Sequence, residues 1–557
     1  MSHKNKKTTS RPSVAEKTAD AKSTPSATGA TYKTTPRRPL PAAVVYLPVF
    51  ILLWIFCTWI YGDVFCRTAE ENFITTDATA MRFLTDQSYG WLYWLCRWPL
   101  LLLGNKLAGG LLLGAVFTLI TLLADRLFGL AGFRRGTMII IPGLLLGWTV
   151  YQGVNLYNKH EPSLFLVFTL LTLLVLTVAV AVKHFLLGRK REGNITGRFP
   201  LGWTLAAVVF AALTLSVRSF RANDILTARL QNQMYKADWT EMIEEAQAAD
   251  RPSRAVAAYH AIALLQSGRL LDEMFNIPYD FPESNVRNDE KANEYSLFTA
   301  DCNFYAGLVN AAYRNCMDHT VMNGPSLYYL KRMVICAIVN GERELAHKYL
   351  ALIGKMPFEK DFIEKYAPMA DDHSLAEKDE ELARVIALCP TEKRFEQFYM
   401  PPAFLGYNAG LLSGTNATLE TAIAARLYSK DLSTCAELIQ NYANLHNGTI
   451  PQSLQQALTI IAQKNPQVEQ AFRNIVQQQS QTLMTFLAAT KPLIDERTQL
   501  YAGKSDKEKQ RIRDEYNKKI REAMRGDWLG TYYYYYYCEN NDQDQIRPAA
   551  EKGSGIN

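Results

Sequence analysis

Five long apolar segments between residues 41 and 217 constrain the fold of this 557-residue chain more than any other feature. They are dominated by Leu, Val, Ile, Phe and Trp, and they cover about residues 41–62, 107–124, 137–156, 163–187 and 200–217. A helix of roughly 20 apolar residues crosses the hydrocarbon core of a bilayer, and a single segment can satisfy its own backbone there only as a helix. The sequence therefore predicts a bundle of five transmembrane helices over residues 41–217.

A sixth apolar segment, "YGWLYWLCRWPLLLLGN" (Tyr89–Asn105), is interpreted differently. Arg97 lies at its middle, and an arginine is costly in the hydrocarbon core. Tryptophan, by contrast, is enriched at the membrane–water interface. We therefore expect residues 89–105 to form an amphipathic helix that lies on the membrane or dips partly into it.

Loop charges predict which way the five spans point. With the N-terminus in the cytoplasm, the cytoplasmic loops are basic and the first outer loop is acidic, as the positive-inside rule requires. The basic residues are Arg126, Arg134, Arg135, Lys183, Arg189, Lys190, Arg191 and Arg198, and the acidic ones are Asp63, Glu70, Glu71, Asp77 and Asp86. A sixth span would place Arg134 and Arg135 outside. The chain after about residue 218 is therefore predicted to be extracytoplasmic.

The first 40 residues are rich in Lys, Arg, Ser, Thr and Pro and cannot bury a core, so they are predicted to be a disordered cytoplasmic tail. The first apolar run is long and bulky and has no cleavage site of small residues. We expect it to be an uncleaved membrane anchor rather than a signal peptide.

Two glycine pairs are predicted to pack transmembrane helices closely. Gly110 and Gly114 form a G-x-x-x-G motif in the second segment, and Gly143 and Gly147 form another in the third. Small residues allow two helix backbones to approach, either within one chain or across a dimer seam. No Asp or Glu lies inside the five segments, which disfavours a pump or a proton-coupled carrier.

Residues 218–502 have the periodicity of helices and contain four recurring helix–turn–helix patterns. These patterns cover residues 229–252, 261–275, 333–357 and 425–442. Each resembles a tetratricopeptide (TPR) repeat, although none carries the full signature. The fold class is therefore all-α, with a five-span bundle followed by a TPR-like extramembrane domain in which each helix pair buries its apolar face against its neighbours.

The layout of the chain resembles an uncharacterised bacterial family of polytopic membrane proteins. The resemblance is carried by the first span, "GWLYWLCRWPLLLLGN", the glycine-rich "AGGLLLGA" and the tyrosine-rich end. It implies a bacterial inner-membrane location and a helical, repeat-like C-terminal part. It brings no activity with it.

Searches for catalytic and cofactor motifs find little. "GKS" at residues 503–505 lacks the earlier glycine of a phosphate-binding loop, and Cys316 and His319 have no second pair of metal ligands. No cofactor or metal is expected. The nine cysteines are predicted to be mostly reduced and buried.

Three carboxylates in the first outer loop support an alternative. Glu70, Glu71 and Asp77 precede the interfacial segment, an order that resembles membrane glycosyltransferases using lipid-linked sugars. One of them could act as a base or a metal ligand there. They could equally be solvated loop charges.

Residues 503–557 are predicted to form an amphipathic helix and a tyrosine-rich tail. The helix, residues 505–528, carries its apolar residues at four-residue steps. Six tyrosines follow it: Tyr532, Tyr533, Tyr534, Tyr535, Tyr536 and Tyr537. Tyrosine favours strands, so the run is predicted to be extended, with rings on both faces. It is predicted to bind a groove of its own domain or of a partner, with the membrane interface and another chain's edge as alternatives.

These features together predict an integral inner-membrane protein whose extracytoplasmic domain binds or scaffolds a protein partner. The alternative is an enzyme of envelope glycan assembly. Membrane lipid is the other expected contact, and nucleic-acid binding is not expected because membrane topology accounts for the basic clusters. The oligomeric state stays open.

Overall fold

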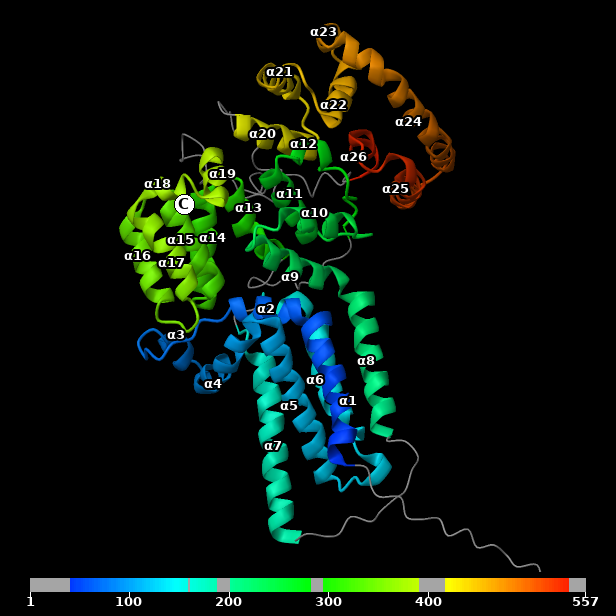
Figure 1. Cartoon of the computed structure of the whole chain (residues 1–557). Coiled ribbons are helices and arrows are strands. Elements are labelled where there is room, and N and C mark those ends of the chain that lie inside the picture. Colours follow the sequence, from blue (N-terminus) through cyan, green and yellow to red (C-terminus); the bar gives the residue numbers. More distant parts are fainter. Residues whose placement is uncertain (1–40, 159–160, 188–200, 282–293, 390–415, 540–557) are drawn as a thin grey trace, which may run out of the picture. The chain divides into compact units, whose positions relative to one another are not determined.

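The computed structural model describes residues 41–158, 161–187, 201–281, 294–389 and 416–539 (Figure 1). By internal contacts, the described residues belong to one compact unit. Throughout the described residues the secondary structure is helical and no strand is present. The all-α fold class, with long apolar helices followed by a helical domain, is confirmed.

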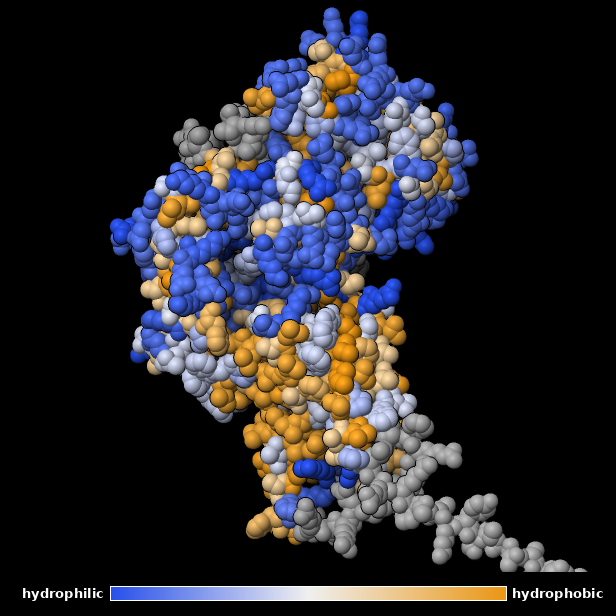
Figure 2. Space-filling model, viewed as in Figure 1, coloured by the Kyte–Doolittle hydropathy of each residue, from blue (hydrophilic) through white to orange (hydrophobic). Residues whose placement is uncertain are grey.

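Five helical segments are long and apolar enough to cross a membrane, as predicted. They are α1 with η1 (Ala42–Ile55, Phe56–Ile60), α5 (Lys106–Leu127), the segment Gly132–Leu156 with α6 (Ile140–Gln152) at its centre, α7 (Leu164–Leu187) and α8 (Leu201–Phe220). Figure 2 shows apolar surface gathered over these segments and polar surface over the helical domain that follows. An apolar surface over the long helices beside a polar surface over the following domain is typical of a membrane protein.

Glycines bring the first two spans together. A Cβ atom at Gly110 would clash with Oγ1 of Thr58, and one at Gly114 would lie 3.3 Å from Cα of Trp54. A Cβ at Gly143 would lie 2.9 Å from the side chain of Val209 in α8. Gly147 differs, because nothing lies within 4 Å of its Cβ position. Three of the four glycines thus meet helices of the same chain.

The second span extends beyond its expected end and includes a buried acid, Asp125. Its carboxylate accepts a hydrogen bond from the Tyr46 hydroxyl at 2.7 Å and one from the Met138 backbone N–H at 3.2 Å. It also accepts from the backbone N–H of Gly136. The carboxylate therefore caps the start of η4 (Thr137–Ile139), in agreement with the preference of helix N-termini for negative charge.

Short helices follow the first span: α2 (Gly62–Glu70), α3 (Arg82–Thr85), α4 (Gly90–Leu100) and η2 (Leu101–Gly104). The segment expected at the interface is thus helical over nearly its whole length. It is also amphipathic, because Arg97 is only 2% exposed whereas Trp91 and Leu95 are exposed. The arginine faces protein rather than lipid.

The remaining helices form the helical domain. They are α9 (Ala222–Met234), α10 (Trp239–Gln247), α11 (Arg254–Ser267), α12 (Leu270–Glu273), η6 (Glu294–Leu297), α13 (Thr299–Tyr305), α14 (Val309–Asn323), α15 (Leu327–Val339), α16 (Arg343–Ile353), α17 (Lys360–Asp371), α18 (His373–Ala376), α19 (Glu380–Leu388), α20 (Asn416–Ser429), α21 (Cys435–Leu445), α22 (Gln452–Ala462), α23 (Pro466–Ala471), α24 (Arg473–Leu500), α25 (Asp506–Trp528) and α26 (Tyr532–Cys538).

All four expected helix–turn–helix patterns are helix pairs in the structure: α9–α10, α11–α12, α15–α16 and α20–α21. A left-handed residue ends the first helix of each pair, with φ of 56° at Ala237, 69° at Gly268, 73° at Gly341 and 57° at Lys430. Such residues reverse the chain sharply after a helix, and glycine adopts this conformation without steric cost. The turns lie where the sequence placed them.

The prediction of an extended tyrosine run was wrong. Tyr532–Cys538 is a helix, α26, whose N-cap Thr531 accepts a hydrogen bond from the Tyr534 backbone N–H. It packs against α22 and α25. Strand propensity reflects a fit to a half-buried sheet surface, and the described residues contain no strand for the run to pair with. Packing among helices therefore decides the conformation.

Candidate functional site

The three carboxylates Glu70, Glu71 and Asp77, which follow the first span, each face a basic side chain. Glu70 lies 3.3 Å from Nζ of Lys331, and Asp77 lies 2.7 Å from Nζ of Lys355. Both lysines belong to the helical domain, so these pairs link the loop to α15 and to the end of α16. Glu70 and Asp77 are therefore engaged in ion pairs with the helical domain.

Glu71 is more deeply buried than the other two. Its carboxylate pairs with Arg67 one helical turn away, with 2.6 Å between Oε1 and Nη2. Burial raises the pKa of Glu71, and the charge of Arg67 opposes that shift. The Arg67 guanidinium lies over the Tyr328 ring, 3.6 Å from its centroid, which is a cation–π contact. This pair anchors α2 against α15.

A second buried ion pair lies behind the first. Nη2 of Arg332 is 2.7 Å from the Asp301 carboxylate, and both side chains are at most 2% exposed. The hydroxyls of Tyr259, at 3.0 Å, and Tyr328 also donate to Asp301. Since a buried charge is costly unless it is paired and hydrogen-bonded, these partners account for its presence. The network joins α11, α13 and α15.

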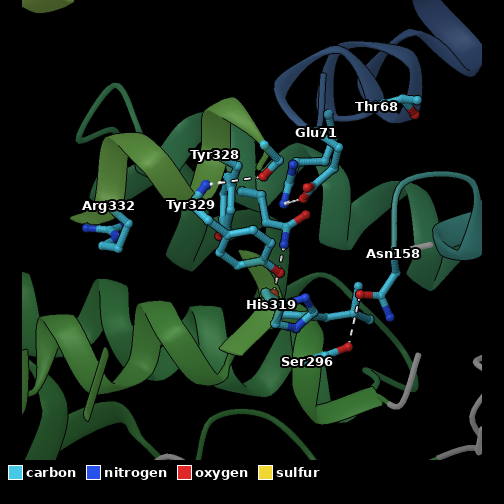
Figure 3. A network of polar contacts seen from close by, with 12 residues as sticks. Thr68, Glu71, Asn158, Ser296, His319, Tyr328, Tyr329 and Arg332 are labelled. Atoms are coloured by element: carbon cyan, nitrogen blue, oxygen red, sulfur yellow. Dashed lines mark hydrogen bonds and ion pairs between the residues drawn. The ribbon is translucent and has the colours of Figure 1, made fainter. Parts of the chain in front are cut away.

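A pocket opens beside this polar network (Figure 3). It is small: the centre of a water molecule can occupy only about 20 Å³ of it, which is room for about one water. The lining combines the first outer loop, α4, the segment between the third and fourth spans, and the α14–α15 corner. The lining residues are Glu71, Arg97, Tyr157, Asn158, Pro162, His319, Asn323, Gly324, Pro325, Ser326 and Tyr329. Membrane-proximal residues and the helical domain thus build the site jointly.

Two buried side chains in the wall of the pocket have polar atoms without a hydrogen-bond partner. Arg97 donates through Nη1 to the Phe73 carbonyl at 3.1 Å, and its Nη2 lies 3.5 Å from Glu161, but its Nε has no acceptor. The Tyr157 hydroxyl also has none, although the residue is only 2% exposed. Both atoms have almost no accessible surface, so they are buried within the wall.

His319 supplies a flat, neutral surface. Its ring stacks on Tyr329 with centroids 4.5 Å apart, and burial lowers its pKa to about 4. At neutral pH the imidazole is therefore uncharged and a weak base. Among the described residues, no group of three His, Cys, Asp or Glu is arranged to hold a metal ion.

The predicted tyrosines lie elsewhere, inside the helical domain. Tyr532 to Tyr535 are buried and Tyr536 and Tyr537 are half-buried. Tyr532 donates its backbone N–H to Gln456 of α22 at 2.7 Å, and its hydroxyl donates to the Leu427 carbonyl at 3.2 Å. The run thus fills a space between helices of its own domain, and the structure does not bring it to the pocket.

Sequence reasoning singled out Glu71 and Arg97 but missed Tyr157 and the role of His319. The sequence offered His319 only beside Cys316 as a metal ligand, yet Cys316 is fully buried and His319 lines the pocket. No local pattern could have connected these residues. The one available signal was the polar "NKHEP" segment (Asn158–Pro162) between two apolar spans.

These features define a helical membrane protein with five apolar spans and a helical domain that meets the loop after the first span. A model of a family described only as a family of unknown function, DUF6057, matches residues 146–539, and the chain belongs to this family. No curated protein and no solved structure matches the chain.

Proposed function

We propose that this protein is a membrane-anchored scaffold whose helical domain binds a protein partner. The long helix α24 supports this proposal most directly. It has 28 residues, of which only Val476, Leu483, Phe486 and Thr490 are buried. Between Arg473 and Lys491 the sequence contains no charged residue.

The exposed side of α24 has the composition of a protein interface. Between Arg473 and Lys491 its exposed residues, all uncharged, are Asn474, Gln477, Gln478, Gln481, Thr482, Met484, Thr485, Ala488 and Ala489, whereas exposed charges such as Asp495 and Glu496 occur nearer its C-terminal end. Charged residues are depleted and Met is enriched at the centres of protein interfaces. The neighbouring α25 provides a contrast, because its outer side carries pairs such as Lys518–Glu522. Figure 1 shows α24 at the edge of the helical domain.

We propose that the helical domain is a TPR-like stack and that it lies on the extracytoplasmic side of a bacterial inner membrane. Basic residues support this orientation. Lys183 of α7 donates hydrogen bonds to the carbonyls of Arg126 and Leu127, so these basic residues gather at one end of the spans. By the positive-inside rule that end is cytoplasmic, and α9 continues from the opposite end of α8.

The tyrosine helix has a supporting role in this proposal. Four of its six tyrosines are buried in the domain, so partner binding through Tyr532–Tyr535 requires α26 to leave its place. We propose that α26 closes the stack. Deleting the chain from Tyr532 onward then unfolds the last helices; increased partner affinity would instead favour a displaceable tail.

The glycosyltransferase alternative has less support, because Glu70, Glu71 and Asp77 all engage cations. Replacing these three with Ala and measuring sugar transfer from a lipid-linked donor tests it directly. Transfer that is lost while folding persists would restore the enzyme as the better explanation.

Site-specific photocrosslinking in intact cells tests the scaffold. A photoreactive amino acid at Gln478 or Thr485 of α24 is expected to give one discrete adduct with the same protein. The matched control is Lys518, which is exposed on α25. Met484→Glu, at a residue that is 64% exposed, should abolish the adduct without unfolding the domain. Adducts that are equally strong at Lys518, or that survive Met484→Glu, would refute the proposed surface.

A further inference from the structure

The helical domain exposes large apolar side chains in two turns that lie near the spans. Val321 and Met322, in the last turn of α14, have exposed fractions of 76% and 58%, and Phe358, between α16 and α17, is 80% exposed. We propose that these three side chains insert into the lipid leaflet beside α4. The inference goes beyond the interfacial position predicted for α4, because it gives the helical domain a membrane contact of its own. It is independent of the scaffold proposal, since it concerns other residues.

The backbone of Phe358 is strained. Its φ is 70°, in the left-handed region, which is costly for a bulky side chain and free of steric cost for glycine. Packing inside the chain compensates little of that cost, because most of the ring is exposed. Strained residues persist where their surroundings stabilise them, and they gather at sites that contact other molecules. The conformation of Phe358 therefore indicates that its ring contacts something outside the chain.

Tyr89 shows the same combination of strain and exposure. It is the N-cap of α4, its φ is 62°, and it is 73% exposed. On α4 itself, Trp91 and Leu95 are also exposed. Tyr and Trp are enriched at the membrane–water interface, where the ring reaches apolar lipid and the polar atom reaches water. Tyr89 and α4 therefore present a surface that suits this interface.

Two contacts place the turns of the helical domain beside α3, the short helix that precedes α4. Nζ of Lys355, just after α16, lies 2.7 Å from the Asp77 carboxylate. A Cβ atom at Gly324, just after α14, would lie 2.5 Å from the Phe83 ring of α3. Figure 1 shows the turn between α16 and α17 next to α3. Both turns therefore lie at the end of the helical domain that meets α3 and α4.

The position of α4 relative to the spans favours lipid as the partner of this surface. α4 packs against α7, and Arg97 of α4 lies 3.5 Å from Glu161, just before that span begins at Leu164. α4 is therefore level with one end of the spans. The bilayer that the spans cross surrounds them at this level, so lipid reaches an apolar side chain there unless another protein displaces it. A lipid leaflet is thus the occupant that the spans themselves supply.

The test uses the full chain in phosphatidylcholine nanodiscs. Part of the lipid carries a photoreactive diazirine near the glycerol end of one acyl chain, and adducts are mapped by mass spectrometry after trypsin digestion. Trypsin releases two peptides of equal length, residues 356–360 with Phe358 and residues 344–348 from the start of α16. We expect lipid adducts on residues 356–360 and on Val321 or Met322, and none on residues 344–348.

Two substitutions of Phe358 sharpen the test. Phe358→Asp should abolish the adduct on residues 356–360 while adducts on the spans persist. Phe358→Gly should also lose this adduct, but glycine adopts the left-handed conformation without cost, so the variant should unfold in detergent at an unchanged or higher temperature. Glu344→Asp, at an exposed position of α16, is the control and should leave the adduct unchanged.

Two results would overturn the proposal. One is the absence of adducts on residues 356–360, or their equal abundance on residues 344–348, because either result would mean that the turn after α16 has no specific contact with lipid. The other is a marked fall in the unfolding temperature of Phe358→Gly, because the ring would then be needed for packing inside the chain.

Discussion

An alanine scan of the tyrosine run is the sharpest test of the fold at the C-terminal end. In α26 the residues Tyr532 and Tyr535 lie one helical turn apart and are both 0% exposed, whereas Tyr536 and Tyr537 are half-buried. We expect Tyr535→Ala to be among the most destabilising single substitutions of the run. Tyr537→Ala, further along the same helix, is the matched control.

The magnitude follows from the surroundings of Tyr535. Its ring lies 4.8 Å from Phe275 and 5.0 Å from Tyr279, and its hydroxyl donates to the Tyr428 carbonyl. Truncation to Ala removes about 150 Å² of buried ring surface. At about 25 cal/mol/Å², this loss lowers the free energy of unfolding by about 4 kcal/mol. This agrees with the range of about 3–5 kcal/mol for removing a buried aromatic ring. For half-buried Tyr537 the same reasoning gives about 2 kcal/mol.

Hydrogen exchange of the full chain in detergent measures this difference locally, in peptides that cover α22 and α26. Local opening free energies are read from such protection. A loss of about 4 kcal/mol lowers protection roughly a thousandfold, and a loss of about 2 kcal/mol lowers it roughly thirtyfold. An alternating pattern, with Tyr532, Tyr534 and Tyr536 costly and the other three tolerant, would indicate a strand and would refute the helical packing.

Three further predictions concern other parts of the molecule. Asp301→Ala leaves the Arg332 guanidinium buried without its carboxylate, which should lower the free energy of unfolding by about 3–5 kcal/mol. The loss is measured as a lower urea midpoint for thiol exposure, and an unchanged midpoint would contradict the buried pair. Gly110→Val should separate the first two spans and lower the thermal aggregation temperature in detergent, whereas Gly147→Ala, with open space around it, should leave that temperature unchanged. Burial raises the pKa of Glu539 to about 7, above its ordinary 4.5, so its stabilising contribution is present at low pH and is lost as the pH rises from about 4.5 to 7. Protection of α26, corrected for intrinsic exchange, should fall over that interval, and Glu539→Gln should remove the dependence.

The features that the sequence predicted correctly are local in the chain. A transmembrane helix is set by its own apolar composition, so all five spans were found. The helix pairs were found because the turns carry Gly or a polar residue between two periodic segments, as at Gly268 and Gly341. The amphipathic helix α4 also follows from one arginine among tryptophans, while its place at the membrane interface stays a prediction.

The misses depend on contacts between residues far apart in the chain. Strand propensity of the tyrosines was outweighed by packing against α22, including the bond from Tyr532 to Gln456, which lies 76 residues earlier. The partner of Glu70 is Lys331, 261 residues away, and that of Asp77 is Lys355, 278 residues away. No periodicity or spacing encodes such distances. The sequence could show that the first loop is acidic, but not what its acids face.

The acidic first loop therefore has a different meaning from the one its sequence suggested. Asp63 also meets a cation of the helical domain, with Arg229 at 3.3 Å. Asp77–Lys355 is the more exposed of these pairs, and an exposed pair contributes at most about 1 kcal/mol, so this pair alone would hold the domain weakly. The buried pair of Arg67 and Glu71 under Tyr328 adds packing that water cannot replace. The same contacts bring α14 and α15 beside α4. The ion pairs that hold the helical domain therefore also form the pocket.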